Sequence, residues 1–317
     1  MNSVPIGLGI ATPKKCLKNN DFPPGLATSD EWITQRTGIR QRYVADDETT
    51  ATLATAAARN ALDHAGISSE EIDLIVLGTV TGDYTFPATA VIVQKNLNIT
   101  KGVAFDVNAA CSGFVFALDV ADAYLKQGKA TCALVIGSDT FSKILDWTDR
   151  SSCVLFGDGA GALVLQARKN TDRGLISSKI YSDGSHMDHL ITTGGVSTTG
   201  NSGVVKMRGQ EVFKFAVEKF SESLDELLKN NDMTINDVDL LIPHQANARI
   251  IHKLMESSGI EKERVSINID KYANTSAASI PLALHERKNA FFSGGGRNTV
   301  LLSVGAGFTW GSVLIRL

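Results

Sequence analysis

The sequence lacks any run of about 18 consecutive apolar residues, the minimum for a helix that spans a bilayer. Its first residues, MNSVPIGLGIATPKK, also lack the basic start and the long apolar segment of a secretory signal. We therefore expect no membrane insertion and a cytoplasmic location. With 43% hydrophobic and 21% charged residues, the 317-residue chain has a globular composition and is long enough for one large core or two fused ones.

A strong net charge and paired cysteines are also missing. The formal charge is -3 at pH 7, which provides no electrostatic footprint for nucleic acid or for an anionic membrane surface. The cysteines lie far apart with no CxxC spacing, which argues against a disulfide scaffold and against a zinc site. We therefore expect reduced thiols and no metal at the four cysteines, Cys16, Cys111, Cys132 and Cys153.

Helical patterns alternate with short apolar runs along the chain, which is typical of an α/β fold. The pattern occurs twice: ISSEEIDLIVLGT from Ile67 resembles MTINDVDLLIPHQ from Met233, and the offset is 233 minus 67, or 166 residues. At the same offset Asn108 falls on Asn274, and ALVIGSD falls near VLLSVGAG. Three matches at one offset indicate a duplicated supersecondary unit.

The duplication predicts two halves with different chemistry, residues 1–167 with a candidate nucleophile and residues 168–317 with a histidine and an amide. Two glycine-rich segments, GDGAGALVLQ and GAGFTWGSVLI, resemble nucleotide loops only superficially. Both lead into strand-like runs, so the strand-to-helix context of a dinucleotide site is absent.

Cys111 follows a turn of small residues in DVNAACSGFVFALDVADAYLKQG and opens a predicted helix that is apolar on nearly all sides. Such a helix is usually buried inside a large domain. The partial positive charge at its N-terminus favours an anion, which would lower the pKa of the thiol and make it nucleophilic. From this position alone, an unreactive core cysteine is an equally good interpretation.

His244 ends the apolar stretch VDLLIPH, and Asn274 belongs to the small-residue run ANTSAAS. Either residue alone is more often structural, but together with Cys111 they form the reactive set of two chemistries. A papain-like protease uses Cys, His and Asn in this order, yet its local cysteine signature and a secretory signal are absent. The other chemistry is decarboxylative Claisen condensation.

The motifs DVNAACSGF, GDGAGA, PHQANARI, NTSAAS and GFTWGSVLIRL resemble those of β-ketoacyl-acyl carrier protein synthase III, the initiating condensing enzyme of bacterial-type fatty acid synthesis. The resemblance extends from TSDEWITQRTGIRQR to the last residue and weakens mainly within residues 168–205. It implies a duplicated thiolase-like α/β fold with mixed sheets and buried central helices. It also implies that a short acyl-CoA, acetyl-CoA first, condenses with malonyl-acyl carrier protein to give 3-oxoacyl-acyl carrier protein, CoA and CO2.

The resemblance assigns a role to each reactive residue. Cys111 takes up the acyl group as a thioester, which divides one difficult step into two. His244 and Asn274 each donate a hydrogen bond to the malonyl thioester oxygen as CO2 leaves. The backbone N–H groups of Cys111 and Ala306 form the oxyanion hole for the acyl group, although the family usually has glycine at position 306 and alanine narrows the backbone angles. No cofactor or metal is required.

Trp32, Arg36 and Arg150 match positions that the family uses to bind the adenine and phosphates of CoA, by stacking and paired charges. The first two lie on a predicted helix that starts with a capping box of Thr28 and Glu31.

Phe86 and Phe141 match the acyl pocket of the family, with Phe86 reaching across from the other subunit of a homodimer. The family commonly has a smaller aliphatic residue in place of Phe141, so we expect a short cavity and an acetyl or propionyl starter. Val304 replaces a residue that is often aromatic.

Lys214, Arg249 and Lys253 form a candidate basic patch for the acidic carrier protein, although a merely solvated face is an equally good interpretation. Two other functions are considered, a related Cys-His-Asn acyltransferase of polyketide or quinolone type and a non-catalytic scaffold that binds CoA or carrier protein. The ending GFTWG and the segment around Trp32 argue against the first, and the three filled reactive positions argue against the second.

Overall fold

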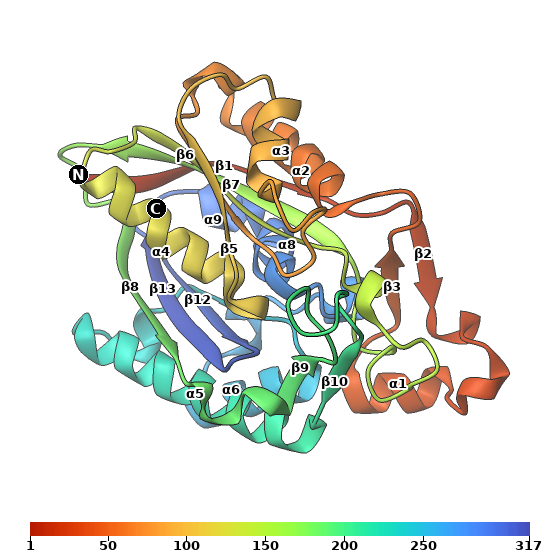
Figure 1. Ribbon diagram of the computed structural model, residues 1–317. Helices are drawn as coiled ribbons and strands as arrows, with labels where there is room; N and C mark the ends of the chain where they lie inside the picture. The colour runs from red at the N-terminus through yellow and green to blue at the C-terminus, as the bar shows by residue number, and fades with distance from the viewer.

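The computed structural model describes residues 1–317 as two main β-sheets with helices between and around them, and two additional two-stranded sheets (Figure 1). The first half contains β1 (Asn2–Ala11), β2 (Lys15–Lys18), α1 (Asp30–Thr37), β3 (Gln41–Val44), α2 (Thr50–Ala65), β4 (Leu74–Gly78), α3 (Thr89–Asn96), β5 (Val103–Val107), α4 (Gly113–Lys126), β6 (Cys132–Asp139) and β7 (Gly159–Arg168). The second half contains β8 (Gly174–Ser182), β9 (Leu190–Thr192), β10 (Val205–Met207), α5 (Gly209–Asn230), β11 (Leu240–Pro243), α6 (Ala248–Ser258), α7 (Ile269–Tyr272), α8 (Ser279–Glu286), α9 (Lys288–Phe292), β12 (Asn298–Gly305) and β13 (Thr309–Arg316). None of these helices combines the length and the apolar character that crossing a membrane requires.

The two main sheets share one strand arrangement, while β2 pairs with β3 and β9 with β10 in the small sheets. The first main sheet has the order β1-β7-β6-β4-β5, and the second has the order β8-β13-β12-β11. Each main sheet is mixed, because β4–β6 and β11–β12 are parallel pairs while β6–β7 and β12–β13 are antiparallel. Adding 166 to the bounds of β6, 132 and 139, gives the bounds of β12, 298 and 305. The repeat and the mixed α/β sheets predicted from the sequence are therefore confirmed.

The repeat extends to the turns that precede the two central helices. A 3-10 turn at Ala110–Ser112 leads into α4, and the turn at Ser276–Ala278 leads into α8, again 276 minus 110, or 166, residues apart. The first residue of each turn has a left-handed backbone, with φ of 47° at Ala110 and 51° at Ser276. The halves differ at β5, because its counterpart in the second sheet is only an isolated bridge between Leu241 and Val265.

Helix α4 lies between the two sheets and packs against β4 and β6 on one side and against β12 and β13 on the other (Figure 1). Its apolar residues Phe114, Val115 and Leu118 have no exposed surface. They belong to the largest apolar cluster, which also takes residues from α8 and from both sheets. The predicted buried central helix is thus observed, and the division into halves at residues 167 and 168 stays a prediction.

The start of α1 differs from the predicted one. The helix begins at Asp30, and Ser29 is the N-cap, because its Oγ accepts a hydrogen bond from the Trp32 N–H at 3.0 Å. The predicted capping box of Thr28 and Glu31 is therefore wrong by one residue. Ser29 has the extended backbone that an N-cap requires and lies one residue closer to the first helical turn.

Candidate functional site

Cys111 lies in the turn between β5 and α4 and is 4% exposed. A side chain at Gly305 on β12 would meet the Cys111 backbone nitrogen at 2.8 Å, so glycine permits the close approach of the second sheet to this turn. Burial raises the pKa of the Cys111 thiol to about 12. The prediction that the helix N-terminus lowers the pKa of the Cys111 thiol is therefore wrong. Desolvation of the buried thiol raises its pKa by more than the helix N-terminus lowers it.

His244 directly follows β11 and is held by its backbone N–H, which donates to the Leu302 carbonyl at 2.7 Å. Its Nδ1 lies 2.5 Å from the Ser279 Oγ, which also accepts the Gln245 N–H at 3.3 Å. When the ring hydrogen lies on Nε2, the Ser279 hydroxyl donates to Nδ1 and still accepts the Gln245 N–H, so both contacts are satisfied in this tautomer. Burial lowers the pKa of His244 to about 3, so the ring is neutral at neutral pH.

Asn274 is fixed through both its backbone and its side chain. The backbone N–H donates to the Leu155 carbonyl at 3.0 Å, and the carbonyl accepts from the Gly157 N–H at 2.9 Å. Its Oδ1 accepts from the Ser276 N–H at 2.9 Å. Because Oδ1 is occupied in this way, the Nδ2 group remains as a donor.

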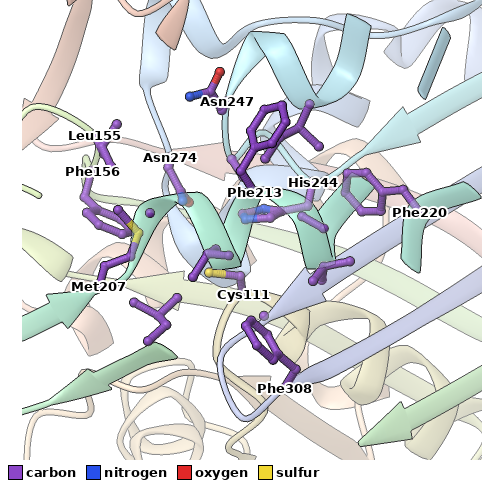
Figure 2. Close-up of a pocket in the computed structure, with 18 residues that line it drawn as sticks. Cys111, Leu155, Phe156, Met207, Phe213, Phe220, His244, Asn247, Asn274 and Phe308 are labelled. Atoms are coloured by element: carbon purple, nitrogen blue, oxygen red, sulfur yellow. The ribbon is translucent and has the colours of Figure 1, made fainter. Parts of the chain in front are cut away.

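All three side chains line a first cavity of about 90 Å³. Figure 2 shows Cys111, His244 and Asn274 pointing into the same space. The structure thus brings together residues from three distant parts of the sequence. The remaining lining is mostly apolar and includes Val304, Phe220 and Phe308. Two N–H donors therefore face the thiol in a largely apolar surrounding.

A second cavity of about 410 Å³ is also lined by Cys111, with Phe141 and Ala306 in its wall. Phe141 stacks on Phe156 with 4.2 Å between ring centroids. Ala306 has no left-handed backbone, so alanine fits there without the strain that glycine would relieve. Phe86 is 84% exposed and lines neither cavity of its own chain.

Trp32, Arg36 and Arg150 come together on the surface. The guanidinium carbons of Arg36 and Arg150 lie 4.6 Å and 5.0 Å from the centroid of the Trp32 ring. Asn247 links this group to the first cavity, because it lines that cavity and its Nδ2 donates to the Arg36 carbonyl at 3.2 Å. The three residues thus form a cationic, aromatic surface that Asn247 connects to the first cavity.

The candidate basic patch is less cationic than the sequence suggests. Lys214 on α5 and Lys253 on α6 form salt bridges with glutamates of their own helices, at 3.8 Å and 2.6 Å. Arg249 has no carboxylate partner and places its guanidinium 5.5 Å from the centroid of the Phe213 ring. Only Arg249 therefore offers an uncompensated positive charge, and Phe213 beside it lines the first cavity.

The sequence interpretation missed the groups that hold the reactive side chains. Ser279 bonds His244, and Ser276 bonds Asn274 through its backbone N–H. Both serines belong to NTSAAS, in which Asn274 was the only residue singled out. The repeated hydroxyl residues in a buried run were the available signal. No group of three or more His, Cys, Asp or Glu side chains is arranged to hold a metal ion.

Comparison with known proteins gives consistent matches. The family model of 3-oxoacyl-[acyl-carrier-protein] synthase III matches residues 105–184, and the model of its C-terminal part matches residues 228–317. The chain is 51% identical over 321 residues to the β-ketoacyl-[acyl-carrier-protein] synthase III of Agrobacterium fabrum, covering 100% of this chain and 99% of that protein.

Solved structures agree with the sequence comparison. The 3-oxoacyl-[acyl-carrier-protein] synthase III of Aquifex aeolicus superposes with a TM-score of 0.94 and is 46% identical, covering 99% of this chain and 100% of that chain. The priming β-ketosynthase of a polyketide biosynthetic pathway superposes with a TM-score of 0.92 and is 32% identical, covering 99% of this chain and 96% of that chain. The duplicated thiolase-like fold predicted from the sequence is therefore confirmed. Two matching family models, high identity over the full length and a shared fold together establish that this chain belongs to the 3-oxoacyl-[acyl-carrier-protein] synthase III family.

Proposed function

We propose that the chain catalyses the decarboxylative Claisen condensation of a short acyl-CoA with malonyl-acyl carrier protein and thereby initiates fatty acid synthesis. The products are 3-oxoacyl-acyl carrier protein, CoA and CO2. The observation that carries this proposal is the first cavity, where the Cys111 thiol faces the N–H donors of His244 and Asn274. The membership in the family, at 51% identity to the Agrobacterium relative, supports the same reaction.

The first half-reaction is acylation of Cys111. The sulfur forms a bond to the acyl carbonyl carbon as its S–H bond breaks, the bond from that carbon to the CoA sulfur breaks, and the released proton ends on the CoA thiol. The backbone N–H groups of Cys111 and Ala306 hold the negative oxygen of the tetrahedral intermediate. The position of Ala306 in the wall of the cavity next to Cys111 supports this role.

The second half-reaction begins with decarboxylation. The malonyl carbon–carbon bond breaks, CO2 leaves, and negative charge develops on the thioester oxygen. A neutral His244 with its hydrogen on Nε2 and an Asn274 with a free Nδ2 supply two donors to this oxygen. The apolar lining favours the step further, because it disfavours the charged carboxylate relative to neutral CO2.

Carbon–carbon bond formation completes the reaction. The enolate carbon attacks the carbonyl carbon of the acyl group on Cys111, and the cysteine leaves as a thiolate. Every group needed for this scheme is a protein side chain or a backbone N–H, so the proposal includes no cofactor and no metal.

The positions of surface residues in the structure support the proposed sites for CoA and for the carrier protein. Trp32, Arg36 and Arg150 bind the adenine and phosphates of CoA, because they form a cationic, aromatic surface beside the first cavity. Arg249 is the main contact for the acidic carrier protein, with Lys214 and Lys253 as weaker contributors. We place the reaction in the cytoplasm.

The acyl group occupies the second cavity in this proposal. Phe141 limits the length of that cavity, so acetyl-CoA or propionyl-CoA is the expected donor. The exposed Phe86 enters the second cavity of a partner subunit in a homodimer. The exposed edge strand β5, with Val103 half exposed, offers a surface for such pairing.

The test is mass spectrometry of the purified protein mixed first with acetyl-CoA and then with malonyl-acyl carrier protein. We expect an acetyl adduct on Cys111 that disappears as acetoacetyl-acyl carrier protein forms, and no adduct in a Cys111→Ala variant. An adduct only with longer acyl-CoA would contradict the acyl length assigned from Phe141. Absence of any adduct would contradict the proposed reaction. A related priming ketosynthase of polyketide type is the second candidate, favoured less because its solved representative is 32% identical.

A further inference from the structure

The two oxyanion donors of the proposed mechanism belong to separate parts of the chain. Cys111 lies in the turn before α4, whereas Ala306 lies in the hairpin loop between β12, which ends at Gly305, and β13, which begins at Thr309. The Ala306 N–H donates no hydrogen bond within the chain, so it remains available to a bound group. A donor on a loop can stabilise a transition state only if other contacts hold that loop in place.

Two hydroxyl groups connect this loop to the turn that carries Cys111. The Thr309 Oγ1 donates to the Ala109 carbonyl at 2.8 Å and also lies 3.1 Å from the Ala306 carbonyl. In the opposite direction, the Ser112 Oγ donates to the Thr309 carbonyl at 3.1 Å. A reciprocal pair of side-chain hydrogen bonds therefore joins the segments that carry the two oxyanion donors.

The backbones of the two segments are in direct contact at this point. A side chain at Gly305 would meet the Ser112 nitrogen at 2.9 Å and the Ala109 carbonyl oxygen at 3.0 Å. The other side of the hairpin loop is held separately, because Phe308 and Asp183 exchange two backbone hydrogen bonds at 2.6 and 2.8 Å. The hydroxyl pair thus acts on the side of the loop that faces Cys111.

The repeat shows that the turn itself does not require the Ser112 hydroxyl. Ala278 is the equivalent residue in the second half, because 278 minus 112 is 166. The Ser112 N–H donates to the Ala109 carbonyl at 3.0 Å, and the Ala278 N–H donates to the Thr275 carbonyl at the same distance. The same turn therefore closes with alanine, and the hydroxyl of Ser112 is left to make the contact with the hairpin loop.

We propose that Ser112 and Thr309 are positioning residues for the acylation of Cys111. Their hydroxyl groups fix the Ala306 loop on the Cys111 turn, and this keeps the two backbone donors in one arrangement while the acyl oxygen becomes negative. The inference deepens the proposed function and rests on its assignment of Cys111 and Ala306.

Two reagents separate this role from a general effect on the thiol. Acetyl-CoA reacts through a tetrahedral intermediate with a negative oxygen, whereas iodoacetamide alkylates the sulfur by displacement of iodide and forms no such oxygen. Peptide mass spectrometry measures the rate of each modification of Cys111 in the full-length protein, with acetyl-CoA at saturating concentration. The proteins compared are the wild type, Thr309→Val, Thr309→Ser and Ser112→Ala.

We expect Thr309→Val, which replaces the hydroxyl by a methyl group, to be acetylated roughly tenfold more slowly, because the donor is displaced but not removed. Ser112→Ala should show a smaller loss, and Thr309→Ser, which keeps the hydroxyl, should restore most of the rate. Alkylation should stay within about twofold of the wild-type rate in each variant, because it uses no oxyanion donor.

Ser303→Ala is the matched control. Ser303 is a buried serine of the same hairpin, and its Oγ donates to the Gly311 carbonyl at 3.4 Å, away from the Cys111 turn. This variant should be acetylated and alkylated at the wild-type rates.

Two outcomes would overturn the positioning role while leaving the proposed function in place. One is acetylation of Thr309→Val at the wild-type rate. The other is an equal loss of acetylation and alkylation, which would indicate a general disturbance of the thiol. A wild type that is alkylated at Cys111 but is acetylated by no acyl-CoA would instead overturn the proposed function, and this inference with it.

Discussion

In the proposed mechanism the Ser279 hydroxyl donates to Nδ1 of His244 and keeps the ring hydrogen on Nε2, so Ser279→Ala tests the proposed decarboxylation step directly. The hydroxyl lies 2.5 Å from Nδ1, and both residues are almost completely buried, at 2% exposure for His244 and 1% for Ser279. Without this donor, the ring hydrogen is free to move to Nδ1. A ring in that form cannot donate from Nε2 to the developing oxyanion.

The size of the effect follows from the burial. Removal of the Ser279 hydroxyl leaves the buried Nδ1 of His244 without its hydrogen-bond donor, at a cost of about 1–3 kcal/mol. If this cost is confined to the transition state, the rate of decarboxylation should fall roughly five- to 150-fold. The acylation of Cys111 does not use the His244 donor in the proposed mechanism. Its rate should therefore change by less than about twofold, a change smaller than the loss of one hydrogen bond.

The assay separates the two half-reactions. Acetylation of Cys111 is followed by mass spectrometry in a single turnover, and CO2 release from malonyl-acyl carrier protein is followed on the acetylated protein. Ser266→Ala is the matched control, because Ser266 is a buried serine that donates to the Ala283 carbonyl at 2.7 Å and makes no hydrogen bond to His244. An equal loss in both half-reactions, or an unchanged rate of CO2 release, would refute the assigned tautomer.

Four further outcomes are expected. Burial lowers the pKa of His244 from 6.5 to about 3, so between these pH values the unfolded chain binds a proton that the folded chain does not. The free energy of unfolding should therefore fall by up to about 1.4 kcal/mol per pH unit as the pH is lowered through this range. Urea titrations of the wild type and of His244→Gln measure this slope, which should be smaller in the variant. Arg249→Glu should weaken use of the carrier protein while acylation by acetyl-CoA is kept, and Lys253→Glu, already paired with Glu256, should have a smaller effect in the same steady-state assay. Phe141→Leu should raise the rate with medium-chain acyl-CoA relative to acetyl-CoA, and a wild type that prefers medium chains would contradict the role of this side chain. Trp32→Ala should raise the KM for acetyl-CoA by roughly tenfold through loss of stacking, and a change in kcat alone would argue against the CoA assignment.

The fold could be predicted from the sequence because its two halves repeat the same pattern. The offset of 166 residues, found from short motifs, applies to the bounds of β6 and β12 and to both turns before the central helices. The position of α4 also followed from its apolar residues, which leave little surface suited to water. The first residue of α1 could not be predicted exactly from the sequence. Thr28 and Ser29 are both good N-cap residues, and only the backbone geometry decides between them.

The site was predicted less completely than the fold. Cys111, His244 and Asn274 could be selected because each is a reactive type in a distinctive motif, and they do line one cavity. The groups that support these side chains could not be selected from the sequence. The contact between Ser279 and His244, for example, spans 35 residues and depends on how two turns pack against each other. The pKa of Cys111 was misjudged for a related reason, since sequence shows the helix start but not the degree of burial.

The burial of α4 between the two sheets also determines how the chain can be divided. Neither sheet has a complete apolar core alone, because the largest cluster draws on α4, α8 and strands from both halves. Loss of either half exposes the other, so denaturation should proceed as one cooperative transition. A protease cut between β7, which ends at Arg168, and β8, which begins at Gly174, should leave two fragments that stay associated. The same fragments produced separately should aggregate, and producing them together should restore the native complex. We therefore expect the two copies of the duplicated unit to depend on each other for folding, because each covers apolar surface of the other.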